Sequence, residues 1–336
     1  MTITDKAPVA QPVETLAPTP VAPRARDLQR TFRLLLATVW LMDAALQLQP
    51  FMFTKGSNGF SGMLSGLAPG NPGWVSHTIT WNASVVNHQP VLTNAVFAGI
   101  QFLIAFGIAW RPTVRPALVL SIVWALGVWW FGEGLGGVLT GSATPLGGGP
   151  GAVLFYALLA VLLWPSEGPN QPFVAARTVG PKVARGIWAA AWASLAVLTV
   201  VGNARSPQAL HDLVVKVDAG QPGWVARIDR WSESNLLHHG TTVAVMFAVF
   251  CLLVALSVYL RPGITRIVLS AAAVAFLLIW VSIENFGGIL AGGATDPNSG
   301  LPALLFIASY WPLTGAQIFG VPVVNRQGRV QTTAED

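Results

Sequence analysis

Two glutamates stand where long apolar runs give way to glycine-rich segments. Glu133 lies in Trp129-Trp130-Phe131-Gly132-Glu133-Gly134-Leu135-Gly136-Gly137, and Glu284 lies in Trp280-Val281-Ser282-Ile283-Glu284-Asn285-Phe286-Gly287-Gly288. A carboxylate inside or beside a membrane-length apolar run is costly unless it is paired, hydrated or functional. We therefore treat both as candidate catalytic residues that accept protons, bind a metal or hold a polar head group. The structural alternative is that each caps its glycine-rich loop or pairs with a histidine.

Asp43 is a third candidate acid, within Trp40-Leu41-Met42-Asp43-Ala44-Ala45-Leu46-Gln47. Residues three and four apart share one face of a helix, so Asp43 faces the same way as Trp40 and Gln47. The second half of the chain has Trp192 at a comparable place, without an acid beside it. Two interpretations stay open: an acid specialised for function, or an aspartate that faces the bundle interior and bonds to Gln or Trp.

Histidines and tryptophans complete the set of candidate site residues. His88 and His238 precede equivalent apolar runs, and His239 is an extra imidazole in the second half. Imidazole suits zinc, copper or iron, so these three are the candidate metal ligands, although no close-spaced ligand motif is present. Trp130 and Trp280, next to the glutamates, are the candidate cofactor-binding residues. The bland alternative is a set of polar and aromatic residues at the level of the lipid head groups.

The elements that must position these residues are apolar helices. The 336 residues are 53% apolar and 10% charged, whereas soluble domains carry about 25% charged residues. Eight apolar segments are long enough to cross a bilayer, namely 31–50, 90–110, 115–132, 150–165, 186–203, 241–260, 264–284 and 301–319. The polar intervals 51–89 and 204–240 predict short amphipathic pieces at the interface. The fold class is therefore an all-α integral membrane protein.

The basic residues indicate the orientation in the membrane. The net charge is +5, but the lysines and arginines are scattered singly among apolar runs, which excludes nucleic acid as a partner and leaves the lipid bilayer. They gather at those helix ends that eight crossings place on one side. The positive-inside rule makes that side cytoplasmic, with both termini inside the cell and the protein in the plasma membrane. The only cysteine, Cys251, excludes an intrachain disulfide.

The chain also repeats itself. Gly70-Asn71-Pro72-Gly73-Trp74-Val75 returns as Gly220-Gln221-Pro222-Gly223-Trp224-Val225, 150 residues later. We expect two parallel four-helix repeats, because an even number of spans per repeat preserves the orientation. The expected organisation is a disordered cytoplasmic tail, a first repeat, a cytoplasmic linker, a second repeat and a second cytoplasmic tail, at 1–30, 31–165, 166–185, 186–320 and 321–336.

A basic turn after the second apolar run carries a resemblance to a known family. Gly107-x-x-x-Arg111-Pro112, with its partner Arg261-Pro262, resembles the corresponding turn of DoxX-like four-helix membrane proteins, and each half of the chain is similar to one such unit. Gln101 stands where an acid is common in that family. The whole chain resembles actinobacterial multi-pass membrane proteins of uncharacterised function. The resemblance implies a redox-associated membrane subunit near quinones or another membrane redox protein.

The predicted site is thus an outward-facing pocket of Asp43, His88, Glu133, His238 and Glu284 in a redox-associated or accessory membrane subunit. The sequence identifies no cofactor and does not decide whether the protein is an enzyme. The alternatives are a transporter or metal-handling permease for a small solute, and a structural or assembly partner. Almost no ionisable residue lies in the inner halves of the predicted spans, which speaks against proton-coupled transport.

Overall fold

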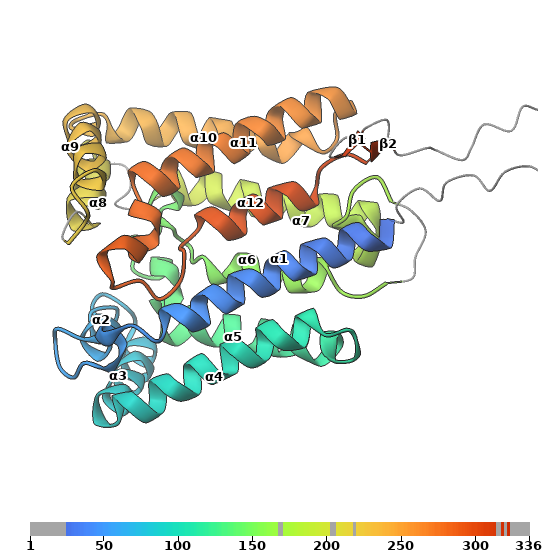
Figure 1. Ribbon diagram of the computed structural model, residues 1–336. Helices are drawn as coiled ribbons and strands as arrows, with labels where there is room; N and C mark the ends of the chain where they lie inside the picture. Colours follow the sequence, from blue (N-terminus) through green and yellow to red (C-terminus); the bar gives the residue numbers. More distant parts are fainter. Residues whose placement is uncertain are drawn as a thin grey trace, which may run out of the picture.

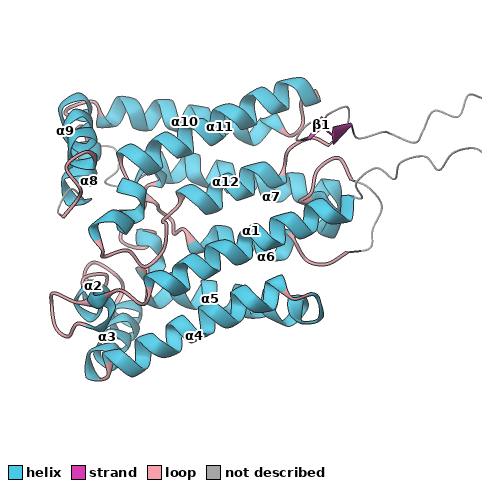
Figure 2. Ribbon diagram, in the orientation of Figure 1, coloured by secondary structure: helices cyan, strands magenta, loops and turns pink. Residues whose placement is uncertain are grey.

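The computed structural model describes residues 25–166, 171–201, 206–217 and 220–313, together with two short strands. These parts are almost entirely helical (Figure 2). The strands β1 (Gln317–Ile318) and β2 (Val321–Pro322) form one antiparallel pair. Most of the predicted terminal tails, and residues 167–170 near the start of the predicted linker, fall outside the described residues.

Eight helices run side by side and form a bundle (Figure 1). They are α1 (Ala25–Leu46), α4 (Pro90–Ala109), α5 (Val114–Phe131), α6 (Val153–Leu162), α7 (Ala176–Val200), α10 (Gly240–Ser257), α11 (Pro262–Ser282) and α12 (Gly300–Ser309). The closest partners are α1 with α4, α7 with α10, and α5 with α6. The short helices α6 and α12 also contact each other, so they join the two halves of the bundle.

Five of the described helices are long and apolar enough to cross a membrane. They correspond to α4, α5, α7, α10 and α11, the last together with the turn that follows it. The chain is therefore an α-helical protein of the membrane type. The helix α1 is 22 residues long but less apolar, since it contains charged residues that include Arg30, Arg33 and Asp43.

Two predicted spans are shorter in the structure than the sequence indicated. The helices α6 and α12 have only 10 residues each, or about 15 Å at 1.5 Å per residue. A hydrocarbon core is about 30 Å thick. Segments without regular α-helix, 132–152 and 283–299, precede these two helices. The spans predicted over 150–165 and 301–319 are therefore longer than the helices, which end at Leu162 and Ser309; residues 314–316 and 319 of the second range lie outside the described residues.

Four further helices gather at one end of the bundle, on the left in Figure 1. They are α2 (Phe60–Ser65), α3 (Gly73–His88), α8 (Ala209–Val217) and α9 (Val225–Leu236). The amphipathic pieces predicted for 51–89 and 204–240 are confirmed as helices here. In α3, buried residues recur at three- and four-residue spacing, at Val75, Ile79, Ala83 and Val86, as expected of a helix with one packed face.

Left-handed backbone turns follow α5 and α11. Four successive residues after Glu133, and four after Glu284, have φ between +47° and +75°; they are Gly134, Leu135, Gly136, Gly137, Asn285, Phe286, Gly287 and Gly288. Each L-residue in this conformation costs about 1–2 kcal/mol, which explains the glycines. A side chain at Gly136 would also collide with the carbonyl oxygen of Pro150, only 1.6 Å from the Cβ position.

Shorter 3₁₀ segments complete the described chain, and an aromatic core joins its halves. The 3₁₀ segments are η1 (Pro50–Phe53), η2 (Arg111–Thr113), η3 (Gly134–Gly137), η4 (Pro145–Gly147) and η6 (Asn285–Ala291). In the core, the Phe155 ring of α6 packs against Phe276 of α11 and Phe306 of α12, and the Trp188 ring stacks with Phe306. Large apolar side chains also cover the outside of the long helices, where a lipid environment would receive them.

Candidate functional site

Asp43 lies in the interior of the bundle, 2% exposed, and pairs with a tyrosine. The Tyr156 hydroxyl of α6 donates a hydrogen bond of 3.1 Å to its Oδ1. One turn earlier on α1, the Trp40 ring meets the Tyr156 ring edge-on at 4.7 Å. The Trp40 indole donates to the Ser121 hydroxyl of α5 at 2.9 Å. Trp40 and Asp43 thus lie on one face of α1, as predicted, and their hydrogen bonds hold this face against α5 and α6.

Glu133 follows α5 and interacts with the start of α6. The backbone N–H groups of Ala152 and Val153 donate towards its carboxyl. Its Oε2 atom has no hydrogen-bond partner among the described residues. That oxygen lies 2.1 Å from the Cβ position of Gly151, so only glycine leaves room for it. Burial, and secondarily the charge of Asp296, raise the pKa of Glu133, while the two amides oppose the shift.

Glu284 makes the matching contact with the start of α12. It is 3% exposed, and its Oε1 accepts a hydrogen bond of 2.5 Å from the Ser299 hydroxyl. Its Oε2 accepts one of 3.2 Å from the Ser299 backbone N–H. A carboxylate is favourable at a helix N-terminus because unpaired amides and the helix dipole point there. Both glutamates thus cap the helix that follows their glycine-rich segment, rather than the segment itself.

Asp296 connects the other acids. It precedes α12 and accepts hydrogen bonds from the Thr295 hydroxyl at 2.8 Å and the Asn298 backbone N–H at 2.7 Å. It interacts electrostatically with Asp43, Glu133 and Glu284. Burial raises the pKa of Asp296, and its two hydrogen bonds act in the opposite direction. We call Asp43, Glu133, Glu284, Asp296 and Tyr156 the acid cluster.

The sequence missed two members of the acid cluster. Asp296 begins Asp296-Pro297-Asn298-Ser299-Gly300, a composition typical of an exposed turn, but this turn is half-buried, with Pro297 and Ser299 enclosed. The acids with which it interacts, Asp43 of α1 and Glu133 after α5, are far away in the sequence. No local sequence pattern therefore predicts that Asp296 is half-buried. Tyr156 carried no signal beyond being one of three tyrosines in the chain. Asp43 was expected to bond to Gln or Trp if structural, and the structure gives it Tyr156 instead.

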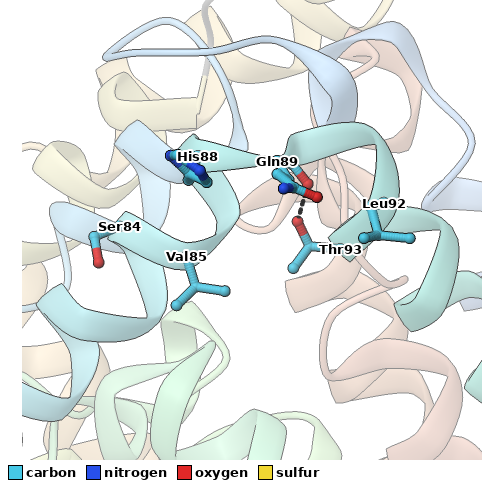
Figure 3. A pocket seen from close by; sticks show the side chains of 6 residues that line it. All are labelled: Ser84, Val85, His88, Gln89, Leu92 and Thr93. Carbon is cyan, nitrogen blue, oxygen red and sulfur yellow. Dashed lines mark hydrogen bonds between the residues drawn. The ribbon is translucent and has the colours of Figure 1, made fainter.

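The histidines lie apart from this cluster. His88 is exposed at the end of α3 and lines an open groove with Ser84, Val85, Gln89, Leu92 and Thr93 (Figure 3). No acid lines that groove. In the second half, the Nδ1 atom of His238 lies 3.2 Å from the Nε2 atom of Gln208, and His239 precedes α10, exposed. Across the described residues, no three His, Cys, Asp or Glu side chains form a group able to hold a metal ion.

The indole N–H groups of the two candidate tryptophans form hydrogen bonds within the protein. The Trp130 indole donates to the Thr78 hydroxyl of α3 at 2.8 Å, and its ring meets Trp74 edge-on. The Trp280 indole donates to the Pro297 carbonyl at 2.7 Å, and its ring meets Phe286. Each indole therefore fastens a peripheral segment to a long helix. Cys251 is buried in α10, as expected of a small apolar residue.

The arrangement can hold protons. Four carboxyls and a phenol interact electrostatically; Asp43, Glu284 and Tyr156 are buried, and Glu133 and Asp296 are half-buried. No lysine, arginine or histidine forms an ion pair with them in the described parts of the chain. Carboxylates removed from water without a counter-cation favour their neutral form.

Comparisons with known proteins supply no family. No protein-family model, no curated protein and no solved structure matches the chain.

Proposed function

We propose that this chain is a multi-pass plasma-membrane protein whose acid cluster accepts and releases protons, as an accessory subunit of a membrane redox system. The observation that carries the proposal is the group of carboxyls around Asp296, which form no ion pair with a cation of the described residues. Ionisable side chains within a membrane bundle are rare and usually serve a proton or ion pathway. Quinone reduction and oxidation exchange protons, which gives such a cluster a use, consistent with the resemblance to DoxX-like units.

The membrane arrangement in this proposal has eight crossings, in two parallel four-helix repeats with both termini in the cytoplasm. Matched contacts in the two halves support it. The indoles of Trp129 and Trp280 donate to the carbonyls of Pro150 and Pro297, at 2.6 and 2.7 Å. Glu133 and Glu284 cap α6 and α12. The left-handed turns follow both glutamates at the same offset.

A second candidate, a permease for a small solute, is favoured by the short helices α6 and α12. Many transporters bind their substrate where interrupted helices meet between repeats, near the middle of the bilayer. Here two 10-residue helices preceded by irregular backbone contact each other at the centre of the bundle. Their N-termini are already capped by the protein's own carboxylates, so an anionic solute would first have to displace Glu133 or Glu284.

Two measurements test the proposal together. In membranes from a strain lacking the protein, we expect slower quinone-linked electron transfer, restored by the wild type but not by Asp43→Asn or Asp296→Asn. The exposed Asp212→Asn is the matched control, because its side chain is 70% exposed. Unchanged electron transfer in the deletion strain would remove the redox role.

Proteoliposomes then separate the two candidates. The accessory subunit predicts proton exchange with the cluster but no net solute flux. A permease predicts flux of a small solute that Glu133→Gln plus Glu284→Gln alters. Absence of flux in both the wild type and the double variant would exclude the permease.

A further inference from the structure

The helices α3 and α9 lie at the same end of the bundle (Figure 1), and each carries a pair of exposed tryptophans. On α3 they are Trp74 and Trp81, 58% and 64% exposed. At the start of α9 and within it they are Trp224 and Trp231, 47% and 65% exposed. Residues seven apart occupy the same face of a helix two turns on. Each helix therefore presents two indoles outwards, of which Trp74 and Trp224 also meet the rings of Trp130 and Phe286 edge-on.

The flanks of the two indole pairs differ in charge. Beside the indoles of α9 lie Arg227 and Arg230, both exposed, at three- and six-residue spacing from Trp224. The same positions of α3 hold His77 and Thr80, also exposed. We call Trp224, Arg227, Arg230 and Trp231 the α9 face. One helix thus carries two permanent positive charges where the other carries none.

The two arginines are free to bind a ligand. Among the described residues, neither forms an ion pair. Of the two acids on the same helix, Asp229 is fully buried, and Glu233, three residues after Arg230, is partly exposed but forms no ion pair with it. A guanidinium binds phosphate oxygens in a bidentate manner. Indoles prefer the level of the head groups, where their ring is in apolar surroundings and their N–H is wet.

We propose that the α9 face binds the phosphate group of an anionic phospholipid in the surrounding leaflet, and that the equivalent face of α3 does not distinguish anionic from neutral lipid. The two indoles would sit at the boundary of the acyl chains while Arg227 and Arg230 reach the phosphate. This commits to a lipid rather than a soluble anion, because the charges flank an apolar stripe that needs a membrane to cover it. The inference requires the bilayer, but not the proton-binding role of the acid cluster.

A local fluorescence titration tests the proposal. Ser234 and Ser84 are exposed at equivalent positions of α9 and α3, and the only native cysteine is buried. A fluorophore on Ser234→Cys or Ser84→Cys of the full chain therefore reports each face separately. The protein is reconstituted in nanodiscs, and brominated phosphatidylglycerol is compared with brominated phosphatidylcholine as quencher. Attraction to anionic lipid contributes about 1 kcal/mol for each arginine near a membrane surface, or about fivefold in affinity for that lipid. This sets the size of the enrichment that we expect.

We expect phosphatidylglycerol to be enriched several-fold at Ser234→Cys and not at Ser84→Cys. Adding Arg227→Gln and Arg230→Gln should abolish the enrichment, whereas Arg227→Lys and Arg230→Lys should keep most of it. Transfer of the charges, by His77→Arg and Thr80→Arg, should create enrichment at Ser84→Cys. Equal quenching by both lipids at Ser234→Cys would overturn the proposal. So would displacement by free glycerol phosphate at millimolar concentration, because the ligand would then be a soluble anion. The two proposals fail separately. If the wild-type protein in these preparations exchanges no protons, the proposed function is contradicted, while the lipid inference depends only on the quenching results.

Discussion

At the scale of single residues, the pair of Asp43 and Tyr156 is the best-defined chemical contact of the site. Both side chains are buried, and the hydroxyl donates to the carboxyl at 3.1 Å. A buried polar group that loses its partner costs about 1–3 kcal/mol. The tyrosine therefore stabilises Asp43 in the bundle and is well placed to pass it a proton or receive one.

Tyr156→Phe tests this contact with little change of shape. We expect a loss of about 1–3 kcal/mol of stability, because Asp43 keeps its burial and loses its donor. Thermal unfolding of the purified protein in detergent measures it. Tyr259→Phe is the control, since Tyr259 is 56% exposed. A Tyr156→Phe protein as stable as the control would show that the hydrogen bond contributes nothing.

Asp296 gives the site a dependence on pH. Burial raises its pKa, so between its usual value of about 3.9 and its higher folded value the folded protein binds more protons than the unfolded chain. Stability from this group is then complete below about pH 4 and is lost as pH rises through the folded pKa. We expect Asp296→Asn to reduce the fall in melting temperature between acidic and neutral pH. The exposed Asp212→Asn should leave it unchanged, and equal slopes in wild type and Asp296→Asn would contradict the assignment.

At the scale of elements, α6 and α12 depend on acids that lie outside them. The two carboxyl oxygens of Glu284 accept hydrogen bonds from the Ser299 hydroxyl and the Ser299 backbone N–H, at the start of α12. Helix caps of this kind contribute about 0.5–2 kcal/mol. Glu284→Ala should lose that amount, while Glu284→Gln, which keeps one acceptor oxygen, should lose less. Identical melting temperatures for wild type and Glu284→Ala would refute the cap.

In the first half of the chain, Gly151 leaves the space that the Glu133 carboxyl occupies at the start of α6. Its φ is +128°, and a Cβ there would lie 2.1 Å from Glu133 Oε2 and 2.7 Å from Trp129 Cδ1. Gly151→Ala should therefore displace Glu133 from the start of α6 and destabilise the protein by more than 1 kcal/mol. Gly127→Ala, with nothing within 4 Å of its Cβ position, is the control. We would detect the difference as a lower melting temperature for Gly151→Ala alone.

The sequence predicted the elements better than their lengths. Apolar runs indicated α4, α5, α7, α10 and α11, because a membrane-length run has few other uses. The shortness of α6 and α12 was hidden, since the residues beside them are also apolar or small. The helix α12 begins where the apolar run begins but ends at Ser309, and α6 is three residues shorter than its run at each end.

At the scale of the whole molecule, the acid cluster forms by long-range contact. Asp43 comes from α1, Glu133 from the end of α5, and Asp296 from the segment before α12. The sequence indicated Asp43, Glu133 and Glu284 one by one, because an acid in an apolar run is exceptional. It could not show that Asp296 joins them or that the histidines stay outside, since both depend on how distant segments pack.

The central claim is that the acid cluster holds protons at neutral pH. Infrared difference spectra of the purified protein, across a pH titration, measure protonated carboxyl groups directly. We predict a carbonyl band of protonated carboxyls that persists at neutral pH in the wild type and in Asp212→Asn. It should weaken in Asp43→Asn and in Glu133→Gln. A spectrum in which every carboxyl is ionised at neutral pH would contradict the account.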